Sequence, residues 1–242
     1  MSSLRLGVSA AVTYAAIIAA ATFYFFQVQD GPADMRGALA LLLPVQLVAV
    51  IFCLAVVARY IGWRGVGFGD MRWAGLIWFL PGWVVLGFMG WGIAEAATAE
   101  NLRGWGTMGF ALMALTTLLI AFGEEVMFRG VLLRSAMTRM SVRLAMLLSI
   151  VSFGLYHLVN GLAGQGASQT SQQVIFAVLS GFFLAPIAVR TGNLWPLIAW
   201  HWFWNMGLIL GQVVGVLYPF ALVGIAIQAV VSLWLWAALT RN

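Results

Sequence analysis

Long apolar runs separated by short connections constrain this chain more than any other feature of its sequence. A run of about 20 apolar residues lets a helix cross about 30 Å of hydrocarbon. Such runs lie near residues 7–28, 38–58, 74–97, 107–130, 143–161, 172–190, 194–212 and 217–239. With 63% hydrophobic and 8% charged residues over 242 residues, the pattern predicts an all-α polytopic membrane protein with about eight transmembrane helices.

The connections between these runs are short, so residues 1–242 are expected to form a single integral-membrane domain. The first run follows a weakly basic segment that contains Arg5, as a signal peptide would. Its apolar part is longer than that of a usual signal peptide, which favours a retained first helix. The single cysteine, Cys53, excludes an intramolecular disulfide.

The placement of arginine predicts the orientation of the chain. With eight spans, one side of the membrane receives Arg5, Arg59, Arg64, Arg72, Arg134, Arg139, Arg143, Arg190 and Arg241. The other side receives only Arg36 and Arg103. Because basic connections are retained in the cytoplasm, both termini are expected to be cytoplasmic. The lack of lysine and the richness in alanine, glycine and arginine indicate a prokaryotic chain, hence the bacterial inner membrane. The net charge of +5 is too scattered to predict a nucleic-acid partner.

One apolar run contains three charged residues within the segment Gly123–Gly130. A charge at membrane depth costs roughly 2.5 to 3.5 kcal/mol on insertion scales, which indicates a functional site. On a helix, Glu125 and Arg129 are four residues apart with the acid first, which is the favourable order for a pair. Glu124 lies about 100° round the helix, which leaves its carboxylate free for chemistry. The alternative is that Arg129 reaches the interface while both acids line a polar seam.

The only two histidines of the chain, His157 and His201, lie in the predicted fifth and seventh spans. A lone intramembrane histidine often only bonds a neighbouring helix, but two of them together with a glutamate pair indicate one site. A hairpin turning near Ser141 would bring Glu125 and His157 to similar depth. His201 and Asn205 share one helix face. The predicted depths of the two histidines still differ by roughly 10 Å at 1.5 Å per residue, which a tilt or a shifted start of the seventh span would have to absorb.

Three ordered motifs therefore lie on the fourth, fifth and seventh spans: Glu124-Glu125-xxx-Arg129, Phe153-xxx-His157 and His201-xxx-Asn205. Together they resemble the CPBP family of intramembrane proteases, over about residues 105–212. This family includes the eukaryotic CAAX prenyl endopeptidase and bacterial proteins described as abortive-infection or bacteriocin-immunity proteins.

The resemblance implies a role for each motif residue. Glu124 would be the general base that activates water, with Glu125 held by Arg129 beside it. His157 would position the water, and Asn160, one turn further on, would support the site. His201 and Asn205 would stabilise the oxyanion.

Metal dependence stays open at this point. Glu124, His157 and His201 would suffice for a three-ligand zinc site with an open position for water. The sequence lacks the HExxH motif that would fix ligand and base roles by its spacing. Zinc and metal-free glutamate catalysis are therefore both retained as expectations.

The resulting expectation is an intramembrane endopeptidase that cuts a membrane-associated peptide or a membrane protein, with its site between the fourth, fifth and seventh helices. One alternative is a non-catalytic immunity or scaffold protein on the same fold. The retention of every polar motif residue argues against that alternative. Another is a proton or cation transporter that uses Glu124, Glu125 and His157 as a relay.

Overall fold

The computed structural model describes residues 3–29, 31–32, 34–216 and 219–239. Its α-helices are α1 (Leu4–Phe23), α2 (Met35–Val56), α3 (Trp63–Val66), α4 (Leu80–Ala96), α5 (Gly106–Glu124), α6 (Leu133–Met137), α7 (Val142–Tyr156), α8 (Ala167–Thr191), α9 (Trp195–Val213) and α10 (Pro219–Leu239). Three segments are π-helical: η1 (Tyr24–Val28), η2 (Val57–Ile61) and η4 (Glu125–Leu132). Two are 3-10 helices: η3 (Trp73–Phe79) and η5 (His157–Ala163). The predicted all-α architecture is confirmed.

Six continuous helical stretches of the described chain are long and apolar enough to cross a membrane: Leu4–Val28, Met35–Ile61, Trp73–Ala96, Gly106–Met137, Val142–Ala163 and Ala167–Thr191. They coincide with the first six apolar runs of the sequence. The seventh and eighth runs correspond to α9 and α10, which are helices but are not among these six stretches. The protein is therefore a polytopic membrane protein with six candidate spans and additional helices.

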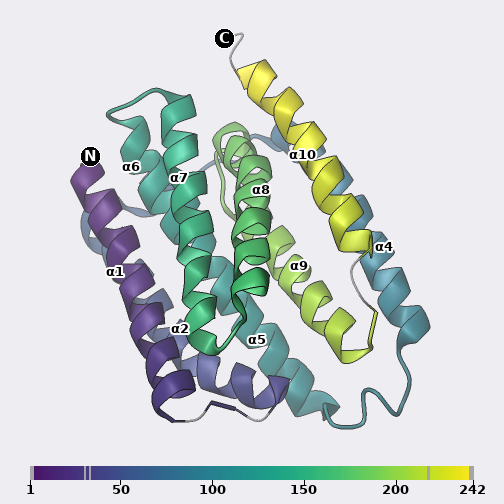
Figure 1. Ribbon diagram of the computed structural model, residues 1–242. Coiled ribbons are helices and arrows are strands. Elements are labelled where there is room, and N and C mark those ends of the chain that lie inside the picture. The colour runs from purple at the N-terminus through teal and green to yellow at the C-terminus, as the bar shows by residue number, and fades with distance from the viewer. Residues whose placement is uncertain (1–2, 30, 33, 217–218, 240–242) are drawn as a thin grey trace.

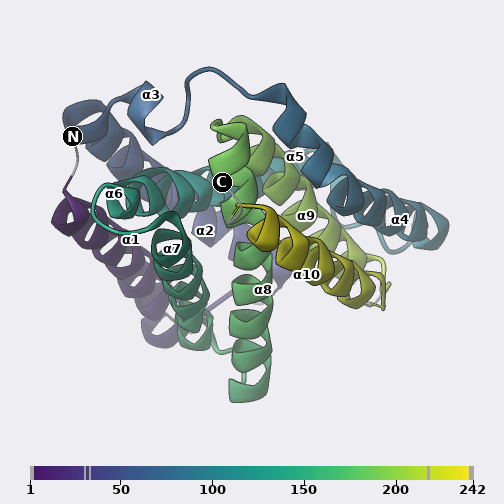
Figure 2. The ribbon, with the colours of Figure 1, turned by 90° about the horizontal axis from the view of Figure 1, so that it is seen from above.

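The helices pack side by side around α5, η4 and α9. α2 and α9 both pack on α5, α1 packs on η4, and α7 packs on α8. α10 lies between α8 and α4, and α1 and α4 lie at opposite sides of the molecule (Figures 1 and 2). α1 begins and α10 ends at the same end, the upper end of Figure 1. The buried residues Glu124, Glu125 and His201 thus lie on these central helices.

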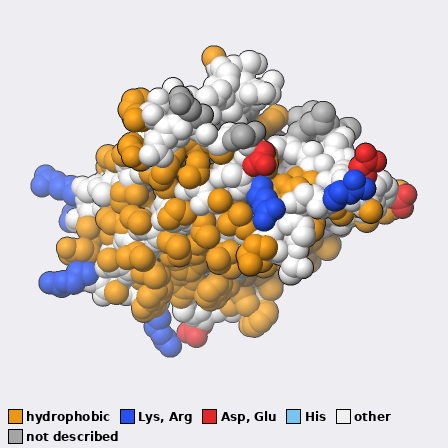
Figure 3. All heavy atoms as spheres, turned by 90° about the horizontal axis from the view of Figure 1, so that it is seen from below, with side chains coloured by type: hydrophobic (Ala, Val, Ile, Leu, Met, Phe, Trp, Pro, Cys, Tyr) orange, Lys and Arg blue, Asp and Glu red, His pale blue; other side chains and the backbone are white. Residues whose placement is uncertain are grey.

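Large apolar side chains cover the outside of the bundle. Val12, Ile51, Trp91 and Leu233 are each more than 60% exposed. Figure 3 shows the lower end of the molecule, where hydrophobic side chains occupy much of the surface and charged side chains are few. Exposed apolar surface on this scale is typical of a protein that contacts lipid.

The connection between α3 and η3 determines where α9 begins. The backbone N–H of Leu194 donates to the carbonyl of Gly67 at 2.8 Å, and the side-chain amide of Asn193 donates to the carbonyl of Gly69 at 2.7 Å. Gly67 has a φ of 111° and Gly192 one of 69°, which a residue with a side chain rarely adopts. The turn after α8 is therefore pinned to this connection before α9 starts.

Gly130 lets η4 approach α3 closely. A Cβ atom at Gly130 would lie 2.5 Å from Val66 Cγ2 and 3.0 Å from the Val66 carbonyl oxygen. We expect Gly130→Ala to lower the free energy of unfolding by about 1 to 3 kcal/mol because the backbone cannot yield without moving α3. Unfolding in detergent measures the effect. Gly90→Ala, whose Cβ would meet nothing within 4 Å, is the control and should not destabilise. Equal stability of the two variants would contradict this account.

Candidate active site

The helix that carries the acids changes type between them. α5 ends at Glu124, and the π-helix η4 begins at Glu125, whereas the sequence predicts one regular run over 107–130. The backbone N–H of Leu133 donates to the carbonyl of Phe128, five residues earlier, and Ser149 Oγ donates to the same carbonyl at 2.8 Å. Such π-helical insertions occur frequently at functional sites. The altered turn starts directly at the glutamate pair.

Glu125 is fixed by two partners. Its Oε1 lies 3.2 Å from an Arg129 guanidinium nitrogen and 2.8 Å from His201 Nδ1. The side chains of Glu125 and Arg129 are both fully buried. Because a carboxylate only accepts, Nδ1 of His201 is the donor. The predicted contact between Glu125 and Arg129 is present, and His201 is an additional partner that sequence reasoning did not assign to Glu125.

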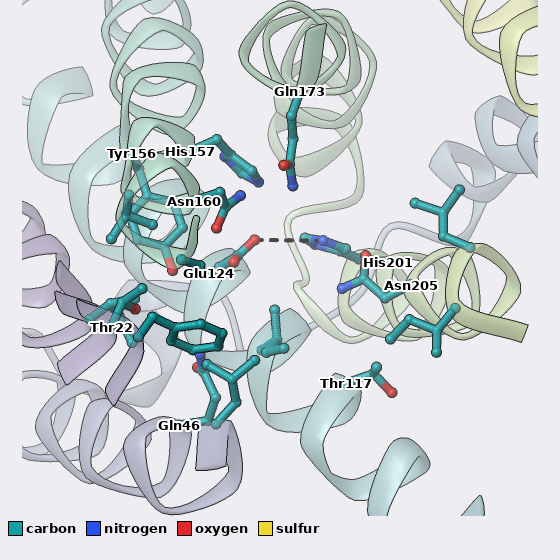
Figure 4. A pocket seen from close by; sticks show the side chains of 18 of the residues that line it. Thr22, Gln46, Thr117, Glu124, Tyr156, His157, Asn160, Gln173, His201 and Asn205 are labelled. Carbon is teal, nitrogen blue, oxygen red and sulfur yellow. Dashed lines mark ion pairs between the residues drawn. The ribbon is translucent and has the colours of Figure 1, made fainter. Parts of the chain in front are cut away.

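Glu124 has a different environment from its neighbour. Its carboxylate lines a cavity, and the ion pair of Arg129 is with Glu125 instead. His201 Nε2 lies 3.6 Å from Glu124 Oε2, marked by the dashed line in Figure 4. This separation is too long for a direct hydrogen bond. Glu125 is therefore held by two short contacts away from the cavity, whereas the Glu124 carboxylate, which Tyr156 and His201 flank, lines the cavity and can contact a molecule in it.

Phe153 connects the charged pair to both histidines. Its ring centroid lies 3.9 Å from the Arg129 guanidinium carbon. Its ring also makes edge-to-face contacts with His157 and His201, at centroid distances of 4.7 and 6.2 Å. The guanidinium nitrogens of Arg129 have no hydrogen-bond partner within the described residues, so the ring face and Glu125 hold this cation. Sequence reasoning named Phe153 only as part of a motif.

His157 presents one ring nitrogen to the cavity. Its Nδ1 lies 2.9 Å from the carbonyl oxygen of Phe153, so Nδ1 is the donor. In the neutral imidazole Nε2 is then an acceptor. The helix changes from α7 to the 3-10 segment η5 at this residue. His157 and Asn160 line the same cavity as Glu124.

His157 and His201 line the same cavity, although the sequence places them about 10 Å apart in depth at 1.5 Å per residue. α9 begins below the upper end of α8 in Figure 1, after the pinned turn at 192–194. α9 therefore starts directly after this turn, and His201 lines the same cavity as Glu124 and His157.

A cavity of about 290 Å³ lies between α1, α2, α5, α7, α8 and α9. It brings together the predicted residues Glu124, His157, Asn160, His201 and Asn205 (Figure 4). Glu125 and Arg129 are fully buried and do not line it. Sequence reasoning missed several further polar lining residues, namely Thr22, Gln46, Thr117, Tyr156, Gln173 and Gln212. Their only signal in the sequence is a polar residue inside an apolar run.

Within the described part of the chain, no group of three or more His, Cys, Asp or Glu side chains is placed as a preformed metal site. Glu124, His157 and His201, the residues predicted as zinc ligands, line one cavity. Glu124 Oε2 and His201 Nε2 lie 3.6 Å apart in it.

Comparison with known proteins adds one finding. Residues 105–207 match the family model described as Type II CAAX prenyl endopeptidase Rce1-like. The matched segment begins just before α5 and ends within α9, so it contains Glu124, His157, His201 and Asn205. Thr22 and Gln46 lie outside it. No curated protein and no solved structure matches the chain.

Proposed function

We propose that this chain, which belongs to the CPBP family through its Rce1-like segment, hydrolyses a peptide bond with water activated by Glu124. At the level of the family it is a CAAX-type intramembrane endopeptidase. The observation that carries the proposal is the contrast between the two adjacent glutamates. Glu125 is held by Arg129 and His201, whereas Glu124 faces the cavity.

The proposed reaction begins with a water molecule bound against the Glu124 carboxylate. Glu124 takes a proton from this water while the water oxygen attacks the carbonyl carbon of the substrate. The C–N bond of the tetrahedral intermediate then breaks, and Glu124 returns the proton to the leaving nitrogen. The products are a new carboxyl terminus and a new amino terminus. Glu125 is unsuited to this role because its carboxylate is fully buried and already paired.

The neighbouring side chains suit the remaining roles. His157 donates from Nδ1 to its own helix, so its Nε2 can accept a hydrogen bond from the attacking water. The amide of Asn205 can donate to the oxyanion. Glu125 accepts from Nδ1 of His201 and so orients the ring. A protonated Nε2 of His201 can then donate a second hydrogen bond to the oxyanion.

Gln46 extends the proposed substrate site to α2. It is only 3% exposed, it lines the cavity, and its Oε1 has no hydrogen-bond partner within the described chain. A peptide N–H would satisfy this oxygen. We expect Gln46→Leu to raise KM about threefold to tenfold with kcat little changed, the loss of about one hydrogen bond. Steady-state kinetics with one peptide measures it. Gln29→Leu, at an exposed position, is the control. An unchanged KM for Gln46→Leu would contradict this role.

Metal dependence has a direct test. Because no group of three possible ligand side chains is placed to hold a metal ion within the described residues, we expect a zinc chelator to leave the cleavage rate unchanged. Cleavage is measured before and after chelation, and again after zinc is added back. Loss with chelator and recovery with zinc would contradict the metal-free form of the proposal.

We infer that the substrate is a membrane-associated peptide or a membrane-protein segment. We further propose that the protein resides in a bacterial inner membrane and that its arginine-rich end faces the cytoplasm. The test is reconstitution of the purified protein into liposomes with a quenched fluorescent peptide library that includes prenylated peptides. Cleavage without proton or cation flux supports the protease. Flux without cleavage would support a transporter. A folded protein that shows neither activity would support an immunity or scaffold role.

A further inference from the structure

A second cavity, of about 340 Å³, lies away from the glutamates at the ends of three helical segments, one first turn and two last turns. η3 begins there, and α8 and α10 end there. Its lining consists of Arg72, Ala74, Gly75, Trp78, Val189, Arg190 and Ala238. None of these residues is acidic. The site is independent of the proposed catalytic reaction.

Arg190 has unused donor capacity in this cavity. Its guanidinium carbon lies 5.2 Å from the centroid of the Trp78 ring, and its Nε is buried without a hydrogen-bond partner in the described chain. The guanidinium of Arg72 donates to the carbonyl of Val189 at 2.6 Å, and its backbone N–H donates to Thr191 at 2.8 Å. Arg72 is thereby fixed at the end of α8, with further N–H groups available.

A third arginine adds positive charge to the same region. Arg134 donates to the carbonyl of Gly192 at 3.1 Å. The Arg72 guanidinium lies against the same glycine, 3.3 Å from where its Cβ would be. Among the described residues, no carboxylate lies within 4.0 Å of Arg72, Arg134 or Arg190, and Asp70 pairs with Arg64 instead. The cluster therefore attracts an anion.

We propose that Arg72 and Arg190 bind a phosphate group in this cavity and that the headgroup of an anionic phospholipid supplies it. Two guanidinium groups match the geometry and charge of a phosphate. The cavity lies at the ends of the candidate spans Trp73–Ala96 and Ala167–Thr191, the depth at which headgroups meet a membrane protein. Trp73 and Ile77 on the same segment are 71% and 67% exposed, which provides apolar surface for the acyl chains.

The test compares lipid retention by detergent-purified variants, using phosphatidylglycerol, phosphatidylcholine and inorganic phosphate as probes. Native mass spectrometry counts the retained lipid, and thermal unfolding reports stabilisation. We expect the wild type to prefer phosphatidylglycerol. Arg72→Gln/Arg190→Gln should weaken its binding by about fivefold or more for each arginine removed. The matched control is Arg139→Gln/Arg143→Gln, which removes the same charge from exposed positions.

Arg190→Gln alone is the variant expected to stay folded, because no hydrogen bond from this side chain to protein is seen within the described chain. Selective loss of phosphatidylglycerol from this variant and from the double variant, with the control unaffected, supports the proposal. Competition by millimolar inorganic phosphate shows that the phosphate group alone is recognised, and no competition assigns the site to the intact lipid. Equal phosphatidylglycerol binding by all variants would overturn the proposal, as would equal retention of phosphatidylcholine.

Discussion

Glu124→Gln is expected to slow peptide cleavage by about 100-fold to 10,000-fold, the range attributed to a general base. Glutamine has nearly the same shape but cannot accept the proton of the attacking water. The His201 ring should stay in place because Glu125 holds its Nδ1 at 2.8 Å. The loss should therefore appear in kcat, with KM little changed, in steady-state measurements on one purified peptide substrate.

The matched control for this substitution is Glu95→Gln, which makes the same chemical change at an exposed position of α4. Its cleavage rate should equal that of the wild type. Thermal unfolding of both variants must show intact folding. A folded Glu124→Gln protein that cleaves at the wild-type rate would remove Glu124 from the proposed mechanism.

Arg129→Met is expected to destabilise the protein by about 3 to 5 kcal/mol, since it leaves one buried charge without its partner. The Glu125 carboxylate would lose the guanidinium at 3.2 Å, and Phe153 would lose the cation 3.9 Å from its ring. Unfolding in detergent measures the difference. Arg139→Met, at an exposed position, is the control and should change stability by less than about 0.5 kcal/mol.

A double substitution separates the two halves of this effect. Arg129→Met/Glu125→Gln removes both charges, so it should recover much of the stability lost by Arg129→Met alone. Cleavage should stay impaired because glutamine does not hold His201 as a carboxylate does. If the double variant is as unstable as the sum of the single ones, the two side chains do not act as a pair.

The sequence predicts much of this architecture for simple physical reasons. Apolar runs must form helices in a bilayer because only a helix satisfies the backbone N–H and C=O groups of a single segment internally. Acids and histidines inside such runs are costly, so Glu124, His157 and His201 stand out without a structure. The spacing of Glu125 and Arg129 likewise predicts a contact that depends on one helix only.

The remaining features depend on contacts between segments far apart in the chain. The bond between Glu125 and His201 joins η4 to α9. The start of α9 depends on the turn before it, where the Leu194 N–H and the Asn193 amide donate to the carbonyls of Gly67 and Gly69. The π-helical turn at Glu125 has no local sequence signal comparable to a proline. Gln46 reaches the cavity only because α2 packs on α5.

The most direct measurement of the central claim is mass spectrometry of one peptide incubated with the wild-type protein and with Glu124→Gln in heavy-oxygen water. The account predicts two product peptides from the wild type, with one heavy oxygen at the new carboxyl terminus, and intact peptide from Glu124→Gln. Equal amounts of the same products from both folded proteins would contradict it, as would an intact peptide with the wild type across a broad library that includes prenylated substrates.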